Sequence, residues 1–224
     1  RKSSSAAAAG PVEVAWLLTG QGAQYPGLGR ELYQTSAAFR RGWDACDERL
    51  GEALGDSLDV LWLDTPACRA RLVQTRWTQA GTFALQYGLA QLWREWGFEP
   101  RWLLGHSAGE VACAALSRVL SLDDAVRLLI ARARLLEELS GGGMLAVSLG
   151  REQLTSQLQA AGCGESLVLA ADNAPQATVV SGPIEALAAF AAHLSGANIA
   201  AQRLEVAGAF HSPAVDRAAA ALAR

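Results

Sequence analysis

The chain has 224 residues, of which 51% are hydrophobic and 18% are charged, and its formal net charge is -3 at pH 7. This composition excludes a disordered chain and predicts a globular protein with one large domain or two unequal ones. The weak negative charge argues against nucleic acid as a partner, and no apolar run reaches the ~18 residues that a membrane span needs.

Cysteine usage predicts neither a disulfide framework nor a metal site. Cys46, Cys68, Cys113 and Cys163 are isolated, with no C-x-x-C pair and no histidine at a matching spacing. Reduced cysteines suit a cytoplasmic protein, which is the location we expect.

Both ends of the sequence are typical of a piece of a longer polypeptide. Residues 1–11 (RKSSSAAAAGP) lack the apolar core of a signal peptide, and their composition predicts a flexible linker. The last residues, DRAAAALAR, follow a helical pattern without a cap or a glycine stop. We therefore expect a larger subdomain that is incomplete at its C-terminus.

The first part of the chain alternates strand and helix patterns. Short buried strands are predicted at 12–18 and 101–105, and helices at about 29–50, 78–96, 108–116 and 121–139. This alternation predicts a parallel sheet with helices on its faces, in an α/β-hydrolase-like subdomain. We assign residues 12–142 and 207–224 to it.

The order changes after residue 142. The patterns there predict strand, helix, strand, strand, helix and strand, at 144–149, 151–162, 166–173, 177–182, 183–197 and 199–206. This βαββαβ order is ferredoxin-like. We therefore expect residues 143–206 to form a small subdomain inserted in the larger one, with a substrate cleft between the two.

Ser107 lies in GHSAG, residues 105–109, which fits the G-x-S-x-G pattern of a nucleophile elbow. In such an elbow the serine occupies a sharp turn between a strand and a helix, and the glycines permit the tight backbone. The alternative is a glycine-rich turn with an incidental serine.

A serine nucleophile needs a base, and the sequence offers three histidines. His106 adjoins Ser107, but neighbouring side chains at such a turn usually point apart. His193 falls in a helical pattern, where a partly exposed structural role is expected. His211, in GAFHSP, follows the inserted unit on a loop, and we favour it as the base over a structural turn histidine.

The oxyanion hole of an elbow enzyme uses the N–H group after the nucleophile, here that of Ala108, and a second N–H from an earlier loop. The segment GQGAQ, residues 20–24, follows the first strand, and the Gln21 N–H is our candidate. The alternatives are a plain turn or a phosphate-binding loop, although the lysine and the full glycine spacing of such loops are missing.

Arg132 lies within the apolar half of a predicted amphipathic helix. At ~100° per residue, that half also holds Leu122, Ala125, Val126, Leu128, Leu129, Ala133, Leu135, Leu136 and Leu139. A buried guanidinium must be paired, either in an internal salt bridge or with a substrate carboxylate that accepts two parallel hydrogen bonds. The second alternative suggests a dicarboxylic half-ester or thioester as substrate.

Together these residues resemble the acyltransferase domains of modular polyketide synthases and the related malonyl-CoA:acyl carrier protein transacylases. The matching segments are GQGAQYPGLGRELY, TQAGTFALQYGLAQLWREWGFEP, GHSAGE, ARARLLEEL, GGGMLAV, DNAPQATVVSG and GAFHSP. They span nearly the whole chain after residue 12. LWREWGFEP and the linker-like start favour a domain of a large synthase.

The resemblance implies a role for each candidate: Ser107 as the acylated nucleophile, His211 as its base, Gln21 and Ala108 as the oxyanion hole, Arg132 as the ligand of the substrate carboxylate, and His106 as a residue that shapes the pocket. Family members that use malonyl have Phe before the histidine, and those that use methylmalonyl generally have Ser. Phe210 therefore favours malonyl, although one methyl group gives only ~1–3 kcal/mol of discrimination.

The expected reaction moves malonyl from malonyl-CoA to the phosphopantetheine thiol of an acyl carrier protein, with no permanently bound cofactor and no metal. The expected partners are that carrier protein and the neighbouring ketosynthase and linker domains of the same synthase. The alternatives are a free-standing transacylase of fatty acid synthesis, a serine esterase or thioesterase, and an inactive scaffold fragment.

Overall fold

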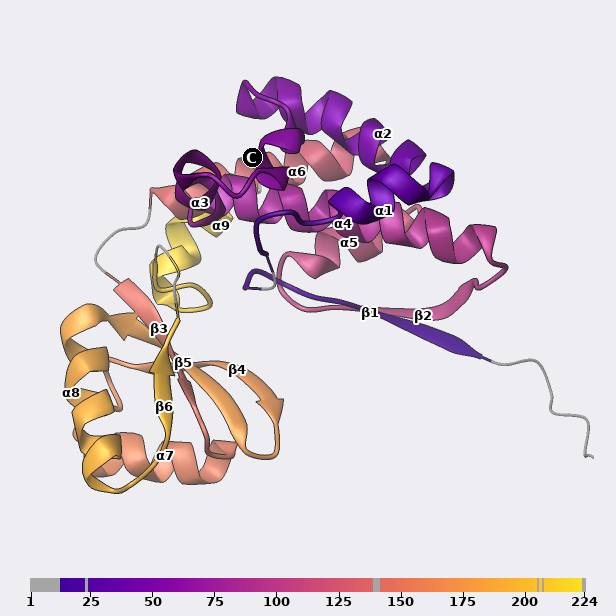
Figure 1. Cartoon of the computed structure of the whole chain (residues 1–224). Helices are drawn as coiled ribbons and strands as arrows, with labels where there is room; N and C mark the ends of the chain where they lie inside the picture. The colour runs from indigo at the N-terminus through magenta and orange to yellow at the C-terminus, as the bar shows by residue number, and fades with distance from the viewer. Residues whose placement is uncertain (1–12, 23, 139–141, 205, 207, 223–224) are drawn as a thin grey trace, which may run out of the picture.

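A computed structural model describes residues 13–22, 24–138, 142–204, 206 and 208–222; the linker predicted for residues 1–11 and Leu139 lie outside them. Figure 1 shows a helical part that carries β1 and β2, and a second part in which a separate sheet is packed against α7 and α8. The helices are α1 (Arg30–Thr35), α2 (Ala37–Leu54), α3 (Pro66–Leu72), α4 (Thr75–Glu95), α5 (Gly109–Leu116), α6 (Leu122–Glu137), α7 (Arg151–Ala160), α8 (Ile184–Gly196) and α9 (Asp216–Leu222), with 3-10 turns η1 (Leu58–Trp62) and η2 (Pro213–Val215). The strands are β1 (Val14–Leu18), β2 (Pro100–Gly105), β3 (Gly142–Val147), β4 (Val168–Ala174), β5 (Ala177–Pro183) and β6 (Ala201–Arg203).

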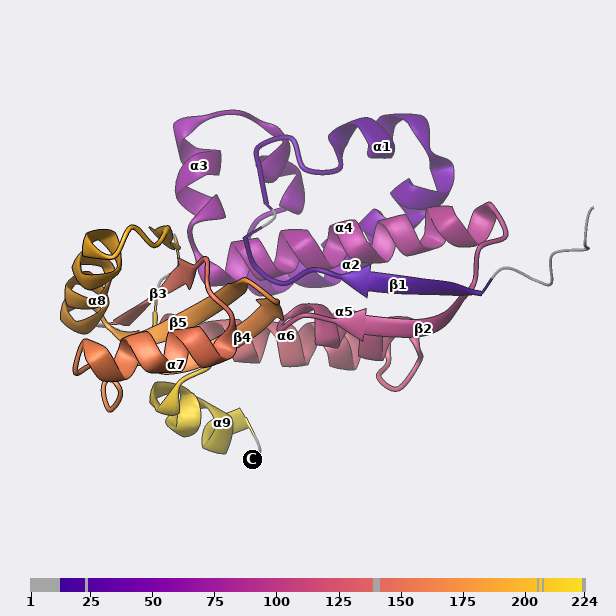
Figure 2. The same cartoon turned by 90° about the horizontal axis from the view of Figure 1, so that it is seen from below.

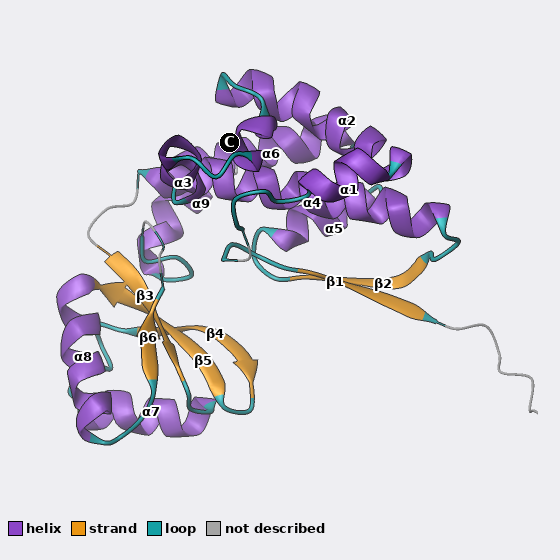
Figure 3. Ribbon diagram, in the orientation of Figure 1, coloured by secondary structure: helices purple, strands orange, loops and turns teal. Residues whose placement is uncertain are grey.

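The first sheet consists of β1 and β2, which pair in parallel as the βα alternation predicts. Helices α4 and α5 lie on one side of it (Figure 3). The expectation of buried strands is wrong for the other face, where Leu17, Trp102 and Leu104 are 74%, 51% and 66% exposed. Apolar runs predict strands buried on both faces, but among the described residues only one face of these strands is covered.

The helix predicted over about 29–50 is two helices, because Ser36 interrupts it. The Ser36 backbone is extended, and its Oγ accepts a hydrogen bond at 3.1 Å from the N–H of Phe39. Serine satisfies the free N–H groups at a helix start in this way, so it begins α2 rather than continuing α1. Helix α3 was not predicted; it starts at a proline after the capping residue Thr65.

Helices α2 and α4 form the centre of the helical core. They approach closely where Gly42 faces Gly88, since a Cβ on Gly42 would lie 2.8 Å from the Cα of Gly88. Phe39, Trp43 and Phe83 are almost fully buried around this crossing. Burial of aromatic side chains of this size is the main source of stability in a core.

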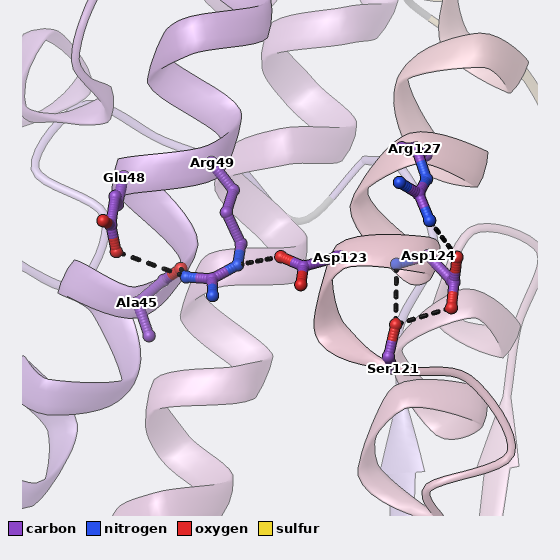
Figure 4. Close-up of polar contacts among 7 residues, drawn as sticks. All are labelled: Ala45, Glu48, Arg49, Ser121, Asp123, Asp124 and Arg127. Carbon is purple, nitrogen blue, oxygen red and sulfur yellow. Dashed lines mark hydrogen bonds and ion pairs between the residues drawn. The ribbon is translucent and has the colours of Figure 1, made fainter.

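Helix α6, which carries Arg132, is fixed at its N-terminus (Figure 4). Ser121 Oγ accepts the N–H of Asp124 at 3.0 Å, so its side chain caps the first turn of the helix. The guanidinium of Arg49 on α2 contacts the carboxylate of Asp123 on the first turn of α6. These contacts hold the start of the helix whose third turn reaches the candidate site.

The second sheet has the strand order β4-β5-β3-β6, with antiparallel neighbours. With α7 and α8 between the strands, this is the ferredoxin-like βαββαβ arrangement that the sequence predicted. Leu154 on α7 and Phe190 on α8 pack with Leu145 and Val180 of the sheet. We call residues 142–203 the small subdomain, and residues 13–138 with 208–222 the large subdomain.

The opposite face of the small sheet contacts the large subdomain. Met144 and Val179 form a buried cluster there with Leu136 of α6 and with Phe210. The last helix, α9, packs against α6 (Figure 2). The segment after the small subdomain thus returns to the helix that carries Arg132. Within the described residues, no helix is both long enough and apolar enough to cross a membrane.

Candidate active site

Ser107 occupies the turn between β2 and α5, where its φ is 54°, in the left-handed region that few non-glycine residues adopt. Glycine is required at positions 105 and 109, because any larger residue would clash with the neighbouring backbone. A Cβ on Gly105 would lie 2.4 Å from the backbone nitrogen of Glu110, and a Cβ on Gly109 would lie 2.4 Å from the carbonyl oxygen of Leu18. The G-x-S-x-G pattern therefore forms the sharp turn expected of a nucleophile elbow, with the serine at its tip.

His211 reaches Ser107 from a segment more than 100 residues later in the chain. Its Nε2 lies 2.9 Å from Ser107 Oγ, within hydrogen-bond distance. The backbone at His211 is also strained, with φ 55°, and Ser212 Oγ fixes the loop by donating to the carbonyl of Ala209 at 2.7 Å. His193 lies elsewhere, on α8, bonded to a glutamine of α7. Of the three histidines, His211 is the one placed to take the serine proton.

The surroundings of His211 favour the neutral imidazole. Burial is the largest cause of its lowered pKa, even though the residue keeps access to solvent, and the nearby Arg132 guanidinium acts in the same direction. The carboxylate of Glu110 opposes them. A histidine whose pKa lies below its usual 6.5 is a free base at neutral pH, as a general base must be.

Arg132 points into the same site, as its place on the helical wheel suggests. Its Nη2 donates a hydrogen bond to Ser107 Oγ at 3.0 Å, and its Nη1 is buried with no hydrogen-bond partner in the described part of the chain. Among the described residues no carboxylate lies within ion-pair distance of Arg132, so the internal salt bridge is not formed there. Burial lowers the pKa of Arg132, but a guanidinium stays charged at neutral pH.

The loop that follows β1 lies directly against the elbow. A Cβ on Gly20 would be 2.7 Å from the carbonyl oxygen of His106 and 3.4 Å from Ser107 Cβ. The N–H groups of Gln21 and Ala108 donate a hydrogen bond to no described residue. Two backbone donors near the serine are the components of an oxyanion hole.

A cavity of about 410 Å³ opens beside Ser107, His211 and Arg132. Its polar lining consists of Ser107, His211, Arg132 and Glu110, and its apolar lining of Leu135, Leu136, Phe210, Val215, Ala219 and Leu222. Glu110 was not among the site residues predicted from the sequence. Its position three residues after Ser107, one turn along the following helix, was the available signal. Among the described residues no group of histidine, cysteine and acidic side chains could hold a metal ion.

The remaining two candidates lie at the edges of the site. Phe210 is buried beside His211 and lines the cavity. His106 Nε2 lies 3.2 Å from Oδ1 of Asn173 on β4, and among the described residues His106 forms no hydrogen bond with Ser107. Asn173 lies in the segment DNAPQATVVSG, but no role was predicted for it.

A serine on an elbow, a histidine within reach of its Oγ and a pair of free N–H groups define a class of proteins that form esters on serine. A family model described as "Acyl transferase domain" matches residues 15–224. The chain belongs to this family, as the resemblance predicted.

Its relatives are polyketide synthases and transacylases. Erythronolide synthase EryA2 of Saccharopolyspora erythraea is 37% identical over 205 residues, which are 91% of this chain and 6% of the relative. The solved acyltransferase domain from module 8 of the salinomycin polyketide synthase is 34% identical, with a TM-score of 0.83, over 92% of this chain and 48% of that one. A solved malonyl CoA-acyl carrier protein transacylase from Clostridium perfringens is 25% identical, with a TM-score of 0.80, over 94% of this chain and 66% of that one. The chain thus spans a small part of the synthase and about half of the salinomycin domain.

Proposed function

We propose that this chain is an acyltransferase that loads malonyl from CoA onto the phosphopantetheine thiol of an acyl carrier protein, through an ester on Ser107. The observation that carries the proposal is the position of Arg132. One of its guanidinium nitrogens contacts Ser107 Oγ in the cavity that Arg132 lines, and the other is buried with no hydrogen-bond partner among the described residues. A buried donor of this kind calls for an acceptor, and a carboxylate can accept from both nitrogens at once.

In the first half of the reaction, Ser107 Oγ attacks the thioester carbonyl while His211 Nε2 takes the serine proton. The N–H groups of Gln21 and Ala108 stabilise the negative oxygen of the tetrahedral intermediate. The carbon–sulfur bond then breaks, and the CoA sulfur leaves with the proton from His211. The product is a malonyl ester on Ser107.

The second half runs the same steps in reverse with a new thiol. The phosphopantetheine sulfur attacks the ester carbonyl and gives its proton to His211, and Ser107 leaves and recovers that proton. Arg132 holds the malonyl carboxylate through both halves, which fixes the acyl group in one orientation. No resident cofactor or metal takes part.

The relatives support the proposed substrate and partners. The Clostridium perfringens neighbour is described as a malonyl CoA-acyl carrier protein transacylase, and other neighbours are acyltransferase domains of synthases. Phe210 beside His211 supports malonyl over bulkier extender units, because its ring fills part of the cavity wall. We propose that the partners are a carrier protein and, within the same synthase, ketosynthase and linker domains.

Intact-mass spectrometry of the protein mixed with malonyl-CoA, followed by addition of a phosphopantetheinylated carrier protein, tests this function. We expect one stable malonyl adduct that moves to the carrier and that is missing in Ser107→Ala. Release of free malonate without a stable adduct would identify a thioesterase instead. An absence of any reaction would favour a scaffold role.

A further inference from the structure

The two subdomains are joined by a hydrogen bond next to the nucleophile. His106 Nε2 lies 3.2 Å from Oδ1 of Asn173, which is on β4 of the small subdomain. Among the described residues, this is the only hydrogen bond or ion pair between residues 142–203 and residues 13–138. Figure 2 shows the end of β4 beside the turn between β2 and α5.

A β-bulge directs Asn173 toward the elbow. Asp172 pairs with Thr178 and Ala174 pairs with Ala177, so Asn173 is an extra residue on β4 with no partner on β5. Bulges re-aim a side chain and are frequent near active sites. Arg151 on α7 forms an ion pair at 3.0 Å with Asp172, which anchors the strand next to the bulge.

The contact also fixes the proton on the His106 ring. An amide oxygen only accepts hydrogen bonds, so Nε2 of His106 must carry the proton that Asn173 accepts. On its other side, the ring packs against the loop after β1, since a Cβ on Gly20 would lie 3.0 Å from Nδ1. The imidazole is thus held between that loop and β4, where its Nε2–H is taken up by Asn173.

We propose that Asn173 is a positioning residue of the acyl-transfer site, which acts through His106. By accepting the His106 hydrogen bond, it keeps a second imidazole from competing with His211 for the serine. It also holds the small subdomain against the turn whose N–H groups stabilise the tetrahedral intermediate. This inference rests on the proposed function, and it adds a residue of the small subdomain to a site otherwise built from the large one.

The test compares Asn173→Ala with Gln202→Ala. Gln202 is a matched control, because its side chain is an exposed amide that lines, together with Asn173, a groove on the small sheet. Among the described residues it forms no hydrogen bond with the large subdomain. The primary readout is the rate at which a small alkyl fluorophosphonate labels Ser107, which needs an activated serine but no malonyl. Loss of one neutral hydrogen bond should slow this labelling about 3- to 10-fold in Asn173→Ala. Gln202→Ala should match the wild type, and all melting midpoints should agree.

Two further variants separate positioning from a general effect on structure. Asn173→Asp keeps an acceptor for His106 and should recover most of the labelling rate. In a His106→Ala background, Asn173→Ala should cause no additional loss, because the residue it acts through is gone. Equal labelling of Asn173→Ala and wild type, or an undiminished loss in the His106→Ala background, would overturn the inference.

Malonyl-CoA is used in parallel to keep the inference apart from the proposed function. If the fluorophosphonate labels Ser107 but malonyl-CoA does not acylate it, the proposed function fails, and the effect of Asn173→Ala on labelling still decides the inference. If malonyl-CoA acylates the wild type and the labelling rate is unchanged in Asn173→Ala, only the inference fails.

Discussion

Arg132 Nη2 and Ser107 Oγ are 3.0 Å apart, so a guanidinium on α6 donates directly to the oxygen at the tip of the elbow. The same serine oxygen lies 2.9 Å from His211 Nε2. The two contacts differ in kind: the guanidinium can only donate a hydrogen bond to the serine oxygen, whereas the neutral imidazole can accept the serine proton. In the proposed reaction, the carboxylate of bound malonyl-CoA replaces the serine oxygen as the acceptor for this guanidinium.

The pH dependence of acylation should report the lowered pKa of His211. The base form is the active one, so the rate should rise with pH through the pKa of His211 and then level off. Since burial and the charge of Arg132 lower that pKa, the midpoint should lie below the usual 6.5. Acylation rates with malonyl-CoA between pH 5 and about 8 measure it. A midpoint at or above the ordinary histidine value would contradict this account of the site.

Glu110 should shift that midpoint without supplying the base. Its carboxylate raises the pKa of His211 against the other influences. Glu110→Gln removes the negative charge and keeps the size, so the midpoint should move to lower pH while the plateau rate changes little. The comparison needs only the two pH profiles at equal ionic strength. A shift to higher pH, or none, would show that Glu110 does not act on His211.

Phe210 should restrict the size of the acyl group. Phe210→Ser opens the cavity wall beside His211, so the ratio of methylmalonyl to malonyl transfer should rise, by a factor that corresponds to about 1–3 kcal/mol for one methyl group. Because the ring is buried against Met144 and Val179, its loss should also lower the free energy of unfolding. Competition between the two thioesters measures the first effect, and urea unfolding measures the second. An unchanged ratio in a folded variant would remove Phe210 from the selectivity of the site.

Ser121 should matter for stability and not for chemistry. Ser121→Ala removes the side chain that caps α6, and losses of this kind cost about 0.5–2 kcal/mol. The acylation rate at a temperature well below the melting midpoint should stay near that of the wild type. Urea unfolding and acylation assays on the same preparation measure both values. A large loss of rate without a loss of stability would mean that the cap tunes Arg132 rather than the fold.

The parts of the site that lie in local patterns could be predicted from the sequence. The elbow depends on two glycines beside Ser107, and the inward direction of Arg132 depends on helical periodicity, so both could be derived from neighbouring residues. His211 was selected from three histidines by its loop position. The ferredoxin-like order of strands and helices could be predicted, because each element is short and the strand and helix patterns are clearly separated along the sequence.

Features that depend on distant contacts were missed. The bulge at Asn173 exists because of its pairing with β5, and no pattern in β4 alone reveals it. The exposure of Leu17 and Leu104 was mispredicted, because an apolar run does not say how many faces of a strand are covered. The break at Ser36 had a local signal, since serine is a frequent first residue of a helix, but the surrounding helical pattern outweighed it.

Arg132 is the residue that we propose binds the free carboxylate of the substrate. Removing one partner of such a charged pair costs about 2–5 kcal/mol, which corresponds to roughly a 30- to several-thousand-fold loss in rate. Acetyl-CoA has no carboxylate, so its slow transfer should survive Arg132→Ala. Arg132→Lys should recover only part of the malonyl rate, because an ammonium cannot offer two parallel donors in a fixed plane.

The most direct measurement is the rate of Ser107 acylation by malonyl-CoA and by acetyl-CoA in the wild type and in Arg132→Ala, with a melting curve of each protein. We predict a selective loss for malonyl with an unchanged rate for acetyl and an intact fold. An equal loss for both thioesters would contradict the account, because it would place Arg132 outside the recognition of the substrate carboxylate.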